Sequence, residues 1–392
     1  MSDMEHPQGP TTNRSIGATV GDNTMLLIPS GQERLNQILS LIDSAQSELA
    51  LLFYMFSDDV AGNAILEGLT RAAARGVKVR LLIDGFGCGS ADAEFLAPLK
   101  DAGGHFCIFH PSYGRRYLIR NHQKMAIADR RLALVGGANL DANYLTDQGA
   151  DRWRDLWLLL DGPAVEELSD YFDDVHAWTT GSRNRIRDLR RIIQRHSHGQ
   201  GRVSWRFSGP MRRRNPWPGT IAREIDAGKR LDIVAAYFAP SWPMLKRIGR
   251  LGLRGTARIV NAAKSDNSAT IAAARHTYRR LLRRNVEIYE YQPAKLHTKL
   301  YIVDDVVHIG SSNFDFRSLY LNLEIMLRVE DAGFADQMRA YVDAEIADSV
   351  RITPDLHRQR ASLWRRLKWT LSYWLVTTVD YTVTRRINFG IE

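Results

Sequence analysis

The chain has 392 residues, of which 44% are hydrophobic, a formal net charge of +9 and a pI near 9.6. This length and composition predict a globular protein with a sizeable core, built as one large domain or as two to three smaller ones. The positive charge favours an anionic partner, namely nucleic acid, a phospholipid surface or a phosphate-bearing substrate. The two cysteines, Cys88 and Cys107, give no disulfide framework, and no His/Cys cluster has zinc spacing, so we expect a reducing compartment.

The first segment, residues 1–24, is polar, contains Pro and Gly, and lacks the apolar run of a signal peptide. We expect it to be a disordered leader. No stretch of the sequence reaches the roughly 18 apolar residues that a membrane-spanning helix needs.

From residue 25 onward, the hydrophobic pattern predicts helices alternating with strands. Helices are expected over 34–49, 61–76 and 95–104, and strands over 49–56, 77–84 and 105–110. The same order returns later, with strands over 231–238, 256–260 and 286–291 and helices over 243–255 and 268–285. This repetition predicts an α/β fold with two duplicated halves, residues 25–180 and 221–352.

Two basic segments flank the second half. Residues 181–220 are rich in arginine and broken by Gly and Pro, and we interpret them as a linker, either a solvated connector or an anion- or membrane-facing patch. The tail, residues 353–392, is predicted to form a basic amphipathic helix that lies in a membrane interface or packs on its own domain. Its predicted apolar face consists of Leu363, Trp364, Leu367, Leu371, Trp374 and Leu375.

A polar motif occurs once in each half. It reads NHQKMAIADRRLALVGGANLD over residues 121–141 and LHTKLYIVDDVVHIGSSNFD over residues 296–315. In each copy, a histidine and a lysine two residues apart precede an aspartate, a glycine and an asparagine. The first set is His122, Lys124, Asp129 and Asn139, and the second is His297, Lys299, Asp304 and Asn313. Residues i and i+2 of a strand share a face, so each histidine should point the same way as its lysine.

Such a set of side chains suits a phosphate group. Lysine and asparagine donate to nonbridging oxygens, and a close backbone approach at Gly136 and Gly310 is expected to add N–H donors. One histidine can attack phosphorus while a second protonates the leaving alkoxide. Each half contributes one histidine, so the doubling predicts two halves that face each other across a pseudo-twofold axis.

Each histidine also needs a partner that holds one tautomer. Asp155 follows the first motif and Glu324 follows the second at a corresponding place. We predict that these two acids orient the histidines. The alternative is that both are surface acids on strands.

Over roughly residues 25–350, the paired motifs resemble the H-x-K-x4-D-x6-G-S-x-N motifs of the phospholipase D superfamily. The stretches NFDFRSLYLNLE and RDLWLLLDGPAV are most similar to its cardiolipin synthase branch. The resemblance implies two α/β/α sandwich halves with one shared active site, no metal and no cofactor.

The resemblance also assigns roles to residues. The implied catalytic residues are His122, Lys124, Asp129, His297, Lys299 and Asp304. The implied phosphate-binding residues are Lys124, Asn139, Lys299, Ser311 and Asn313. Gly137 replaces the serine in the first copy, and the second copy is one residue shorter between Asp304 and Gly310. Asp129 and Asp304 lie outside the His/Lys/Asn sets, and their position favours a structural role at a turn.

The function that the resemblance implies is phosphatidyl transfer through a phosphohistidine, with His122 as nucleophile and His297 as general acid. The expected substrates are anionic phospholipids, phosphatidylglycerol among them, and the expected place is the cytoplasmic face of the inner (cell) membrane, peripherally bound. Alternatives are a phospholipase D that uses water, a nucleic-acid phosphodiesterase and a noncatalytic membrane-binding module. The tryptophan-bearing tail argues for a lipid and against a nucleic-acid partner.

Overall fold

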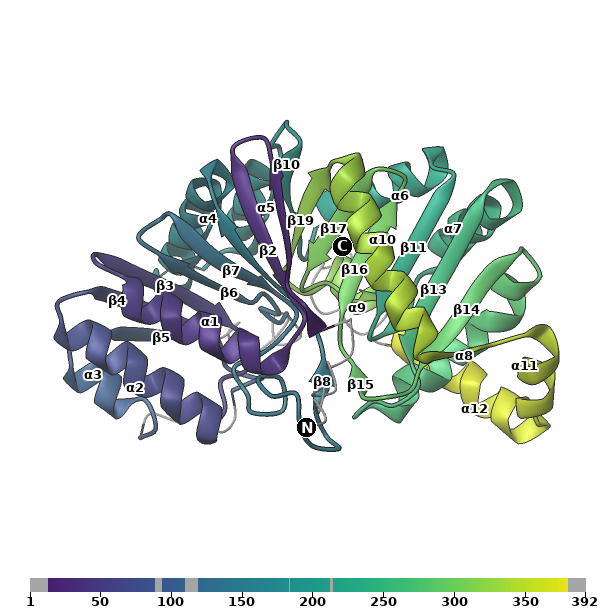
Figure 1. Ribbon diagram of the computed structural model, residues 1–392, viewed down its shortest axis with the longest axis horizontal. Coiled ribbons are helices and arrows are strands. Elements are labelled where there is room, and N and C mark those ends of the chain that lie inside the picture. Colours follow the sequence, from purple (N-terminus) through teal and green to yellow (C-terminus); the bar gives the residue numbers. More distant parts are fainter. Residues whose placement is uncertain (1–12, 89–93, 110–118, 183, 212–213, 380–392) are drawn as a thin grey trace, which may run out of the picture.

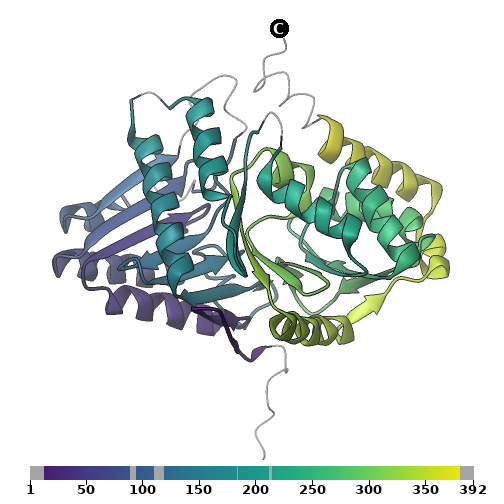
Figure 2. The same ribbon diagram turned by 90° about the horizontal axis from the view of Figure 1, so that it is seen from above.

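A computed structural model describes residues 13–88, 94–109, 119–182, 184–211 and 214–379. Two eight-stranded mixed sheets lie side by side, each with helices on both faces (Figures 1 and 2). Residues 1–12 of the predicted leader lie outside the described ranges.

The first sheet and its helices come from the N-terminal part of the chain. Its elements are β1 (Ile16–Val20), β2 (Asn23–Ile28), α1 (Gly31–Ser44), β3 (Glu48–Phe53), α2 (Val60–Ala74), β4 (Lys78–Asp84), α3 (Ala97–Asp101), β5 (His105–Phe109), β6 (Met125–Ala128), β7 (Leu132–Gly136), β8 (Trp153–Arg154), β9 (Trp157–Asp161), α4 (Pro163–Thr180) and α5 (Ile186–His196).

The second sheet and the C-terminal helices follow. Their elements are β10 (Val203–Ser208), α6 (Pro216–Ala227), β11 (Arg230–Ala235), β12 (Phe238–Ala239), α7 (Trp242–Arg254), β13 (Thr256–Ala262), α8 (Ser268–Leu282), β14 (Val286–Tyr291), β15 (Lys295–Leu296), β16 (Lys299–Val303), β17 (Val306–Gly310), β18 (Phe314–Asp315), α9 (Phe316–Tyr320), β19 (Glu324–Glu330), α10 (Ala332–Ala347), β20 (Ser349–Arg351), α11 (Pro354–Arg360), α12 (Leu363–Trp374) and the π-helical turn η2 (Leu375–Val379).

The strand order confirms the duplicated α/β fold. Six strands of the first sheet run in the order β9-β7-β6-β3-β4-β5, and six of the second run β19-β17-β16-β11-β13-β14. The directions match as well, because β3–β4–β5 and β11–β13–β14 are parallel while the other pairs in both series are antiparallel. The two motif hairpins, β6–β7 and β16–β17, therefore occupy equivalent places.

The leader prediction is wrong for part of residues 1–24. β1 and the start of β2 form a hairpin at the edge of the first sheet, with Gly21 at its turn in a left-handed conformation (φ 57°). Alternate residues of this hairpin face the core, and Val20, Met25 and Leu27 are buried there. This short alternation of apolar and polar residues is typical of an edge hairpin.

The linker prediction for residues 181–220 is also wrong in its central part. β10 is the outermost strand of the second sheet and pairs antiparallel with β19. α5 buries Leu189, Ile192 and Ile193 while its arginines face outward. The arginine-rich composition therefore belongs to the solvent face of a packed helix, and α6 already begins at Pro216.

One core cluster joins the two halves. It includes Leu158 and Phe172 from the first half and Ile325 and Met338 from the second. Nearby, the buried guanidinium of Arg154 donates to the buried carboxylate of Glu345 in α10 at 2.7–2.9 Å. These contacts fix the relative position of the two motif hairpins.

The tail helix α12 packs on its own domain through one face and exposes the predicted apolar face. Trp369 and Ser372 are buried against α8, where Trp369 joins Ala272 and Ala361 in a small apolar cluster. The six residues of the predicted apolar face are exposed, from 44% for Leu375 to 83% for Leu363. Within the described ranges, no helix has the length and apolar character to cross a membrane.

Candidate active site

The backbone of each histidine is paired with the opposite half. His122 N–H donates to Leu323 O at 2.9 Å, beside a parallel bridge between Asn121 and Leu323. In the equivalent place, His297 N–H donates to Arg154 O at 2.7 Å, where β8 pairs in parallel with β15. Each histidine thus lies next to the segment that carries the acid of the other half.

This pairing exchanges the two acids. His122 Nδ1 lies 3.1 Å from Glu324 Oε2, and His297 Nδ1 lies 2.5 Å from Asp155 Oδ2. Both carboxylates are completely buried. The order of the sequence pairs each acid with the motif that it follows, but in the structure each acid contacts the histidine of the opposite half.

The electrostatics favour neutral imidazoles at both positions. Burial lowers the pKa of His122, and Glu324 opposes the shift. Burial and then Lys299 lower the pKa of His297 to about 3 against the opposing charge of Asp155. Burial alone would raise the pKa of Asp155, but Lys299 and His297 hold it below its usual value. A neutral ring that donates from Nδ1 to a carboxylate leaves the Nε2 lone pair free for attack.

Each motif lysine contacts the backbone of the histidine two residues before it. Lys124 Nζ donates to His122 O at 2.6 Å, and Lys299 Nζ donates to His297 O and contacts His297 Nδ1 at 2.5 Å. Both side chains are fully buried, and burial lowers their pKa values to about 7 for Lys124 and about 8 for Lys299. An anion in the site would favour the charged form of both amines.

A cavity of about 620 Å³ joins the two copies of the motif. Its lining includes His122, His297, Asn139 and Asn313. The side-chain oxygens of both asparagines are buried, and neither has a hydrogen-bond partner in the part of the chain that the structure describes. Both amides therefore line the same cavity as the two histidines.

Ser311 contacts the acid of its own half and does not line the active-site cavity. Its hydroxyl donates to Glu324 Oε2 at 2.6 Å and accepts from Ile325 N–H at 3.1 Å. At the equivalent Gly137, a Cβ atom would lie 2.4 Å from Asp155 Oδ1. The serine therefore holds the longer Glu324, while glycine leaves room for the shorter Asp155.

Gly136 and Gly310 were expected to let the backbone approach a phosphate, but in the structure they lie against backbone atoms of another segment. A Cβ atom would lie 2.2 Å from Leu156 O at Gly136 and 2.0 Å from Ile325 O at Gly310. The close approach that these glycines allow is to the neighbouring acid-bearing segment and not to phosphate. It brings each motif hairpin against the strand that follows it.

Asp129 and Asp304 lie at hairpin turns, so a catalytic role for them is wrong. Asp129 accepts from the N–H groups of residues 46–48 at 2.7–2.9 Å, and Asp304 accepts from Lys229 and Arg230 N–H at 3.0 and 2.8 Å. Both residues have left-handed backbones (φ 51° and 47°). Their carboxylates tie the motif hairpin to the start of the adjacent strand.

Several residues that support the site were missed by the sequence analysis. Arg34, buried in α1, donates to Asp155 O and Tyr144 O, both at 2.6 Å. Asp84 accepts from Asn121 N–H at 2.7 Å, just before His122. An arginine on the inward face of a predicted helix and an aspartate that ends a buried strand were signals that could have identified them.

Aromatic rings pack around both histidines. The ring centroid of Tyr54 lies 4.9 Å from that of His122, and the centroids of Tyr144 and Trp153 lie 5.0 and 5.2 Å from that of His297. These rings form an apolar wall that restricts each imidazole to one orientation. Packing of this kind holds a functional side chain in a defined geometry.

Within the described ranges, no group of three or more His, Cys, Asp or Glu side chains could hold a metal ion. Two halves that each place a histidine and an asparagine at one cavity, with a buried lysine beside each histidine, define an enzyme of the phospholipase D superfamily. The sequence matches the family described as "Cardiolipin synthase, PLD-like domain" over residues 38–176 and 221–346, and the chain belongs to this family.

Relatives of known annotation agree with this placement. The chain is 28% identical over 364 residues to a cardiolipin synthase of Listeria monocytogenes, covering 90% of this chain and 74% of that protein. It is also 28% identical to cardiolipin synthase A of Pseudomonas aeruginosa, covering 87% and 70% of the two chains. Phosphatidylserine synthase of Haemophilus influenzae shares the fold, with a TM-score of 0.72, 16% identity and coverage of 94% and 96%.

Proposed function

We propose that the chain is a phosphatidyltransferase of the cardiolipin synthase type, which transfers a phosphatidyl group between phospholipids through a phosphohistidine. The observation that carries this proposal is that two histidines line one cavity and that each contacts an acid of the opposite half, an arrangement that we call the crossed pairing. Each imidazole is held at Nδ1 by an acid of the other half. Each is therefore prepared for chemistry at Nε2.

The first half-reaction forms the covalent intermediate. His122 Nε2 attacks the phosphorus of the donor, and the bond from phosphorus to the headgroup oxygen breaks. The bound phosphate favours the protonated form of His297, which gives its proton to the leaving oxygen. We assign the attack to His122 because its side chain is 13% exposed, against 5% for His297.

The second half-reaction reverses these roles. A hydroxyl of the acceptor lipid gives its proton to His297, and its oxygen attacks phosphorus while the bond to His122 Nε2 breaks. Lys124, Lys299 and the two motif asparagines stabilise the nonbridging oxygens in both steps. When phosphatidylglycerol is both donor and acceptor, the products are cardiolipin and glycerol.

Product analysis with labelled phosphatidylglycerol tests this function. The protein in lipid vesicles should release glycerol and form cardiolipin in equal amounts, and the His122→Ala variant should form neither. Formation of phosphatidic acid without cardiolipin would instead assign the enzyme to the hydrolases and contradict the proposal.

The substrates also imply where the enzyme works. We propose that it binds peripherally to the cytoplasmic face of the cell membrane, with the exposed apolar face of α12 in the interface. Leu363, Trp364, Leu367 and Leu371 are all more than half exposed, and Arg365 and Arg366 are exposed between them. Apolar burial and attraction of arginine to anionic lipids both favour such binding.

Changing this face should weaken membrane binding without unfolding the protein. We expect the triple variant Trp364→Ser, Leu367→Ser, Leu371→Ser to lose at least about tenfold in affinity for anionic vesicles, because several kcal/mol of apolar burial are removed at about 25 cal/mol per Å². Cosedimentation with vesicles measures the loss. The control is Leu253→Ser, a 58% exposed leucine in α7. Unchanged vesicle binding by the triple variant would rule out the interfacial role of α12.

A further inference from the structure

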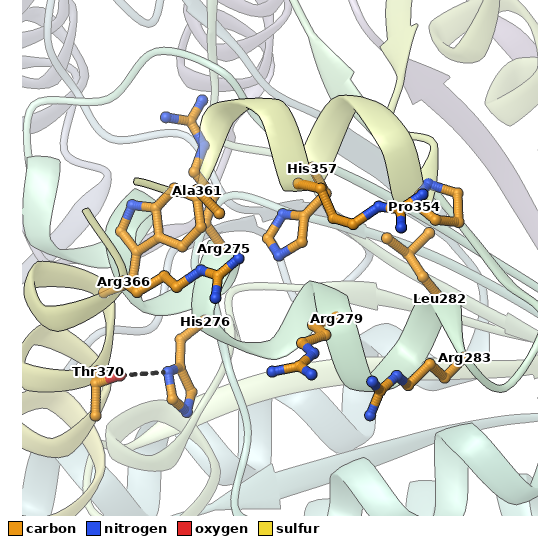
Figure 3. Close-up of a pocket in the computed structure, with 12 residues that line it drawn as sticks. Arg275, His276, Arg279, Leu282, Arg283, Pro354, His357, Ala361, Arg366 and Thr370 are labelled. Atoms are coloured by element: carbon orange, nitrogen blue, oxygen red, sulfur yellow. Dashed lines mark hydrogen bonds between the residues drawn. The ribbon is translucent and has the colours of Figure 1, made fainter. Parts of the chain in front are cut away.

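A second cavity, of about 540 Å³, lies between α8, α11 and α12 (Figure 3). It shares no lining residue with the active-site cavity. Its twelve lining residues include no Asp or Glu and five arginines. These are Arg275, Arg279, Arg283, Arg358 and Arg366, and we call this space the arginine cavity.

Three of these arginines have charges that the protein does not neutralise. Arg275 is held by two hydrogen bonds to Glu290, at 2.8 and 2.9 Å, and Arg358 pairs with Asp355. In the described part of the chain, Arg279, Arg283 and Arg366 have neither an ion pair nor a side-chain hydrogen bond. Arg279 and Arg283 are also like charges four residues apart on one helix, which costs stability when no anion lies between them.

Two histidines that line the arginine cavity are held by contacts with residues of α12. The buried ring of His357 stacks on Trp369 with a centroid distance of 5.3 Å, and His276 Nδ1 lies 3.2 Å from Thr370 Oγ1 (Figure 3). Burial lowers the pKa of both histidines, and Arg366 lowers that of His357 further. The positive charge of the cavity therefore comes from guanidinium groups, whose planar forks match phosphate oxygens.

We propose that the arginine cavity binds the phosphate of an anionic phospholipid headgroup in the membrane, separately from the substrate in the active site. Arg366 and Thr370 line the cavity from one flank of α12, and the exposed Leu367 and Leu371 follow them in sequence on its apolar face. A lipid whose phosphate lies at Arg366 can therefore place its acyl chains beside that face. The inference rests on the membrane part of the proposed function and not on the transfer reaction.

The other flank of α12 is less suited to an anion. A neighbouring cavity there is lined by one acid, Glu290, and by five basic residues, Lys264, Arg275, Arg360, Arg365 and Lys368. Glu290 accepts hydrogen bonds from both Arg275 and Arg360. The lining of the arginine cavity has five positive charges and no negative one, so its net charge is one unit more positive than that of this neighbour.

Vesicle binding by arginine variants tests the inference. Vesicles of phosphatidylcholine with phosphatidylglycerol are compared with phosphatidylcholine alone. The variant Arg279→Gln, Arg283→Gln, Arg366→Gln should lose roughly 100-fold in affinity for the anionic vesicles, at about 1 kcal/mol for each arginine. The charge-preserving variant Arg279→Lys, Arg283→Lys, Arg366→Lys should still lose about tenfold, because lysine cannot form the bidentate contact.

The matched control removes three charges elsewhere. Arg71, Arg131 and Arg202 are more than half exposed, and each already pairs with an acid. When all three are changed to glutamine, the loss of vesicle affinity should be several times smaller than the loss caused by the glutamine variant of the arginine cavity. Thermal melts should show all variants folded, since Arg279, Arg283 and Arg366 are exposed.

Three results would overturn the inference. The glutamine variant could match the surface control, or the lysine variant could bind like the wild type, which would show diffuse attraction without a site. Inorganic phosphate could stabilise the wild type and not the glutamine variant while vesicle binding is equal, which would show a free-phosphate site. Each result leaves the product analysis of the transfer reaction unaffected, so the two proposals fail independently.

Discussion

Replacing either His122 or His297 by alanine is expected to reduce the formation of cardiolipin by at least about 10²–10⁴-fold, the range of general acid–base catalysis. Each histidine has a separate task in the proposed reaction, so neither can replace the other. The loss of His122 should be the more severe, because it removes the nucleophile itself. Turnover of labelled phosphatidylglycerol under steady-state conditions measures both effects.

The matched control is His105→Ala. His105 lies on β5 with its side chain exposed, and it does not line the active-site cavity. This variant should keep the turnover of the wild type. If His122→Ala or His297→Ala kept more than about a tenth of that turnover, a mechanism that needs both histidines would be wrong.

Replacing Glu324 or Asp155 by its neutral amide should reduce turnover by a similar factor, roughly 10²–10⁴-fold. In Glu324→Gln, an amide replaces the carboxylate that lies 3.1 Å from His122 Nδ1, and in Asp155→Asn the same change occurs 2.5 Å from His297 Nδ1. The tautomer with a free Nε2 lone pair is then no longer favoured. The fold should persist, because each change is isosteric.

A donor with a good leaving group shows which histidine each acid serves. A nitrophenyl ester of phosphatidic acid releases nitrophenolate, which can leave without being protonated, so only attack by the nucleophile limits the first turnover. The crossed pairing predicts that Glu324→Gln, like His122→Ala, loses the initial burst of nitrophenol. Asp155→Asn, like His297→Ala, should keep the burst and fail in later turnovers. If Glu324→Gln instead behaved like His297→Ala, and Asp155→Asn like His122→Ala, each acid would serve the histidine of its own half.

The sequence predicted most of the features that depend on local pattern. Helix and strand periodicity located α2, β4 and β14 within a few residues, and the doubled motif identified both histidines and both asparagines. The exchange of Asp155 and Glu324 could not be predicted in the same way. It depends on backbone pairing between segments of different halves, which leaves no trace in the spacing of either motif.

Other differences arise where one composition fits two structures. The arginine-rich stretch around α5 suggests a solvated linker, but Leu189 and Ile193 on its inner face pack into the core. Ser311 carries a hydroxyl in a motif that is predicted to bind phosphate, yet this hydroxyl donates its hydrogen bond to Glu324. In both cases the tertiary neighbour decides the role of the residue.

Identifying the modified residue in a trapped intermediate tests the central claim most directly. The His297→Ala variant is mixed with the nitrophenyl donor, quenched after the burst, digested and analysed by mass spectrometry. We predict a phosphatidyl adduct on His122 in this variant and in Asp155→Asn, and none in His122→Ala. A burst of nitrophenol without an adduct on His122, or with the adduct on another residue, would contradict this prediction.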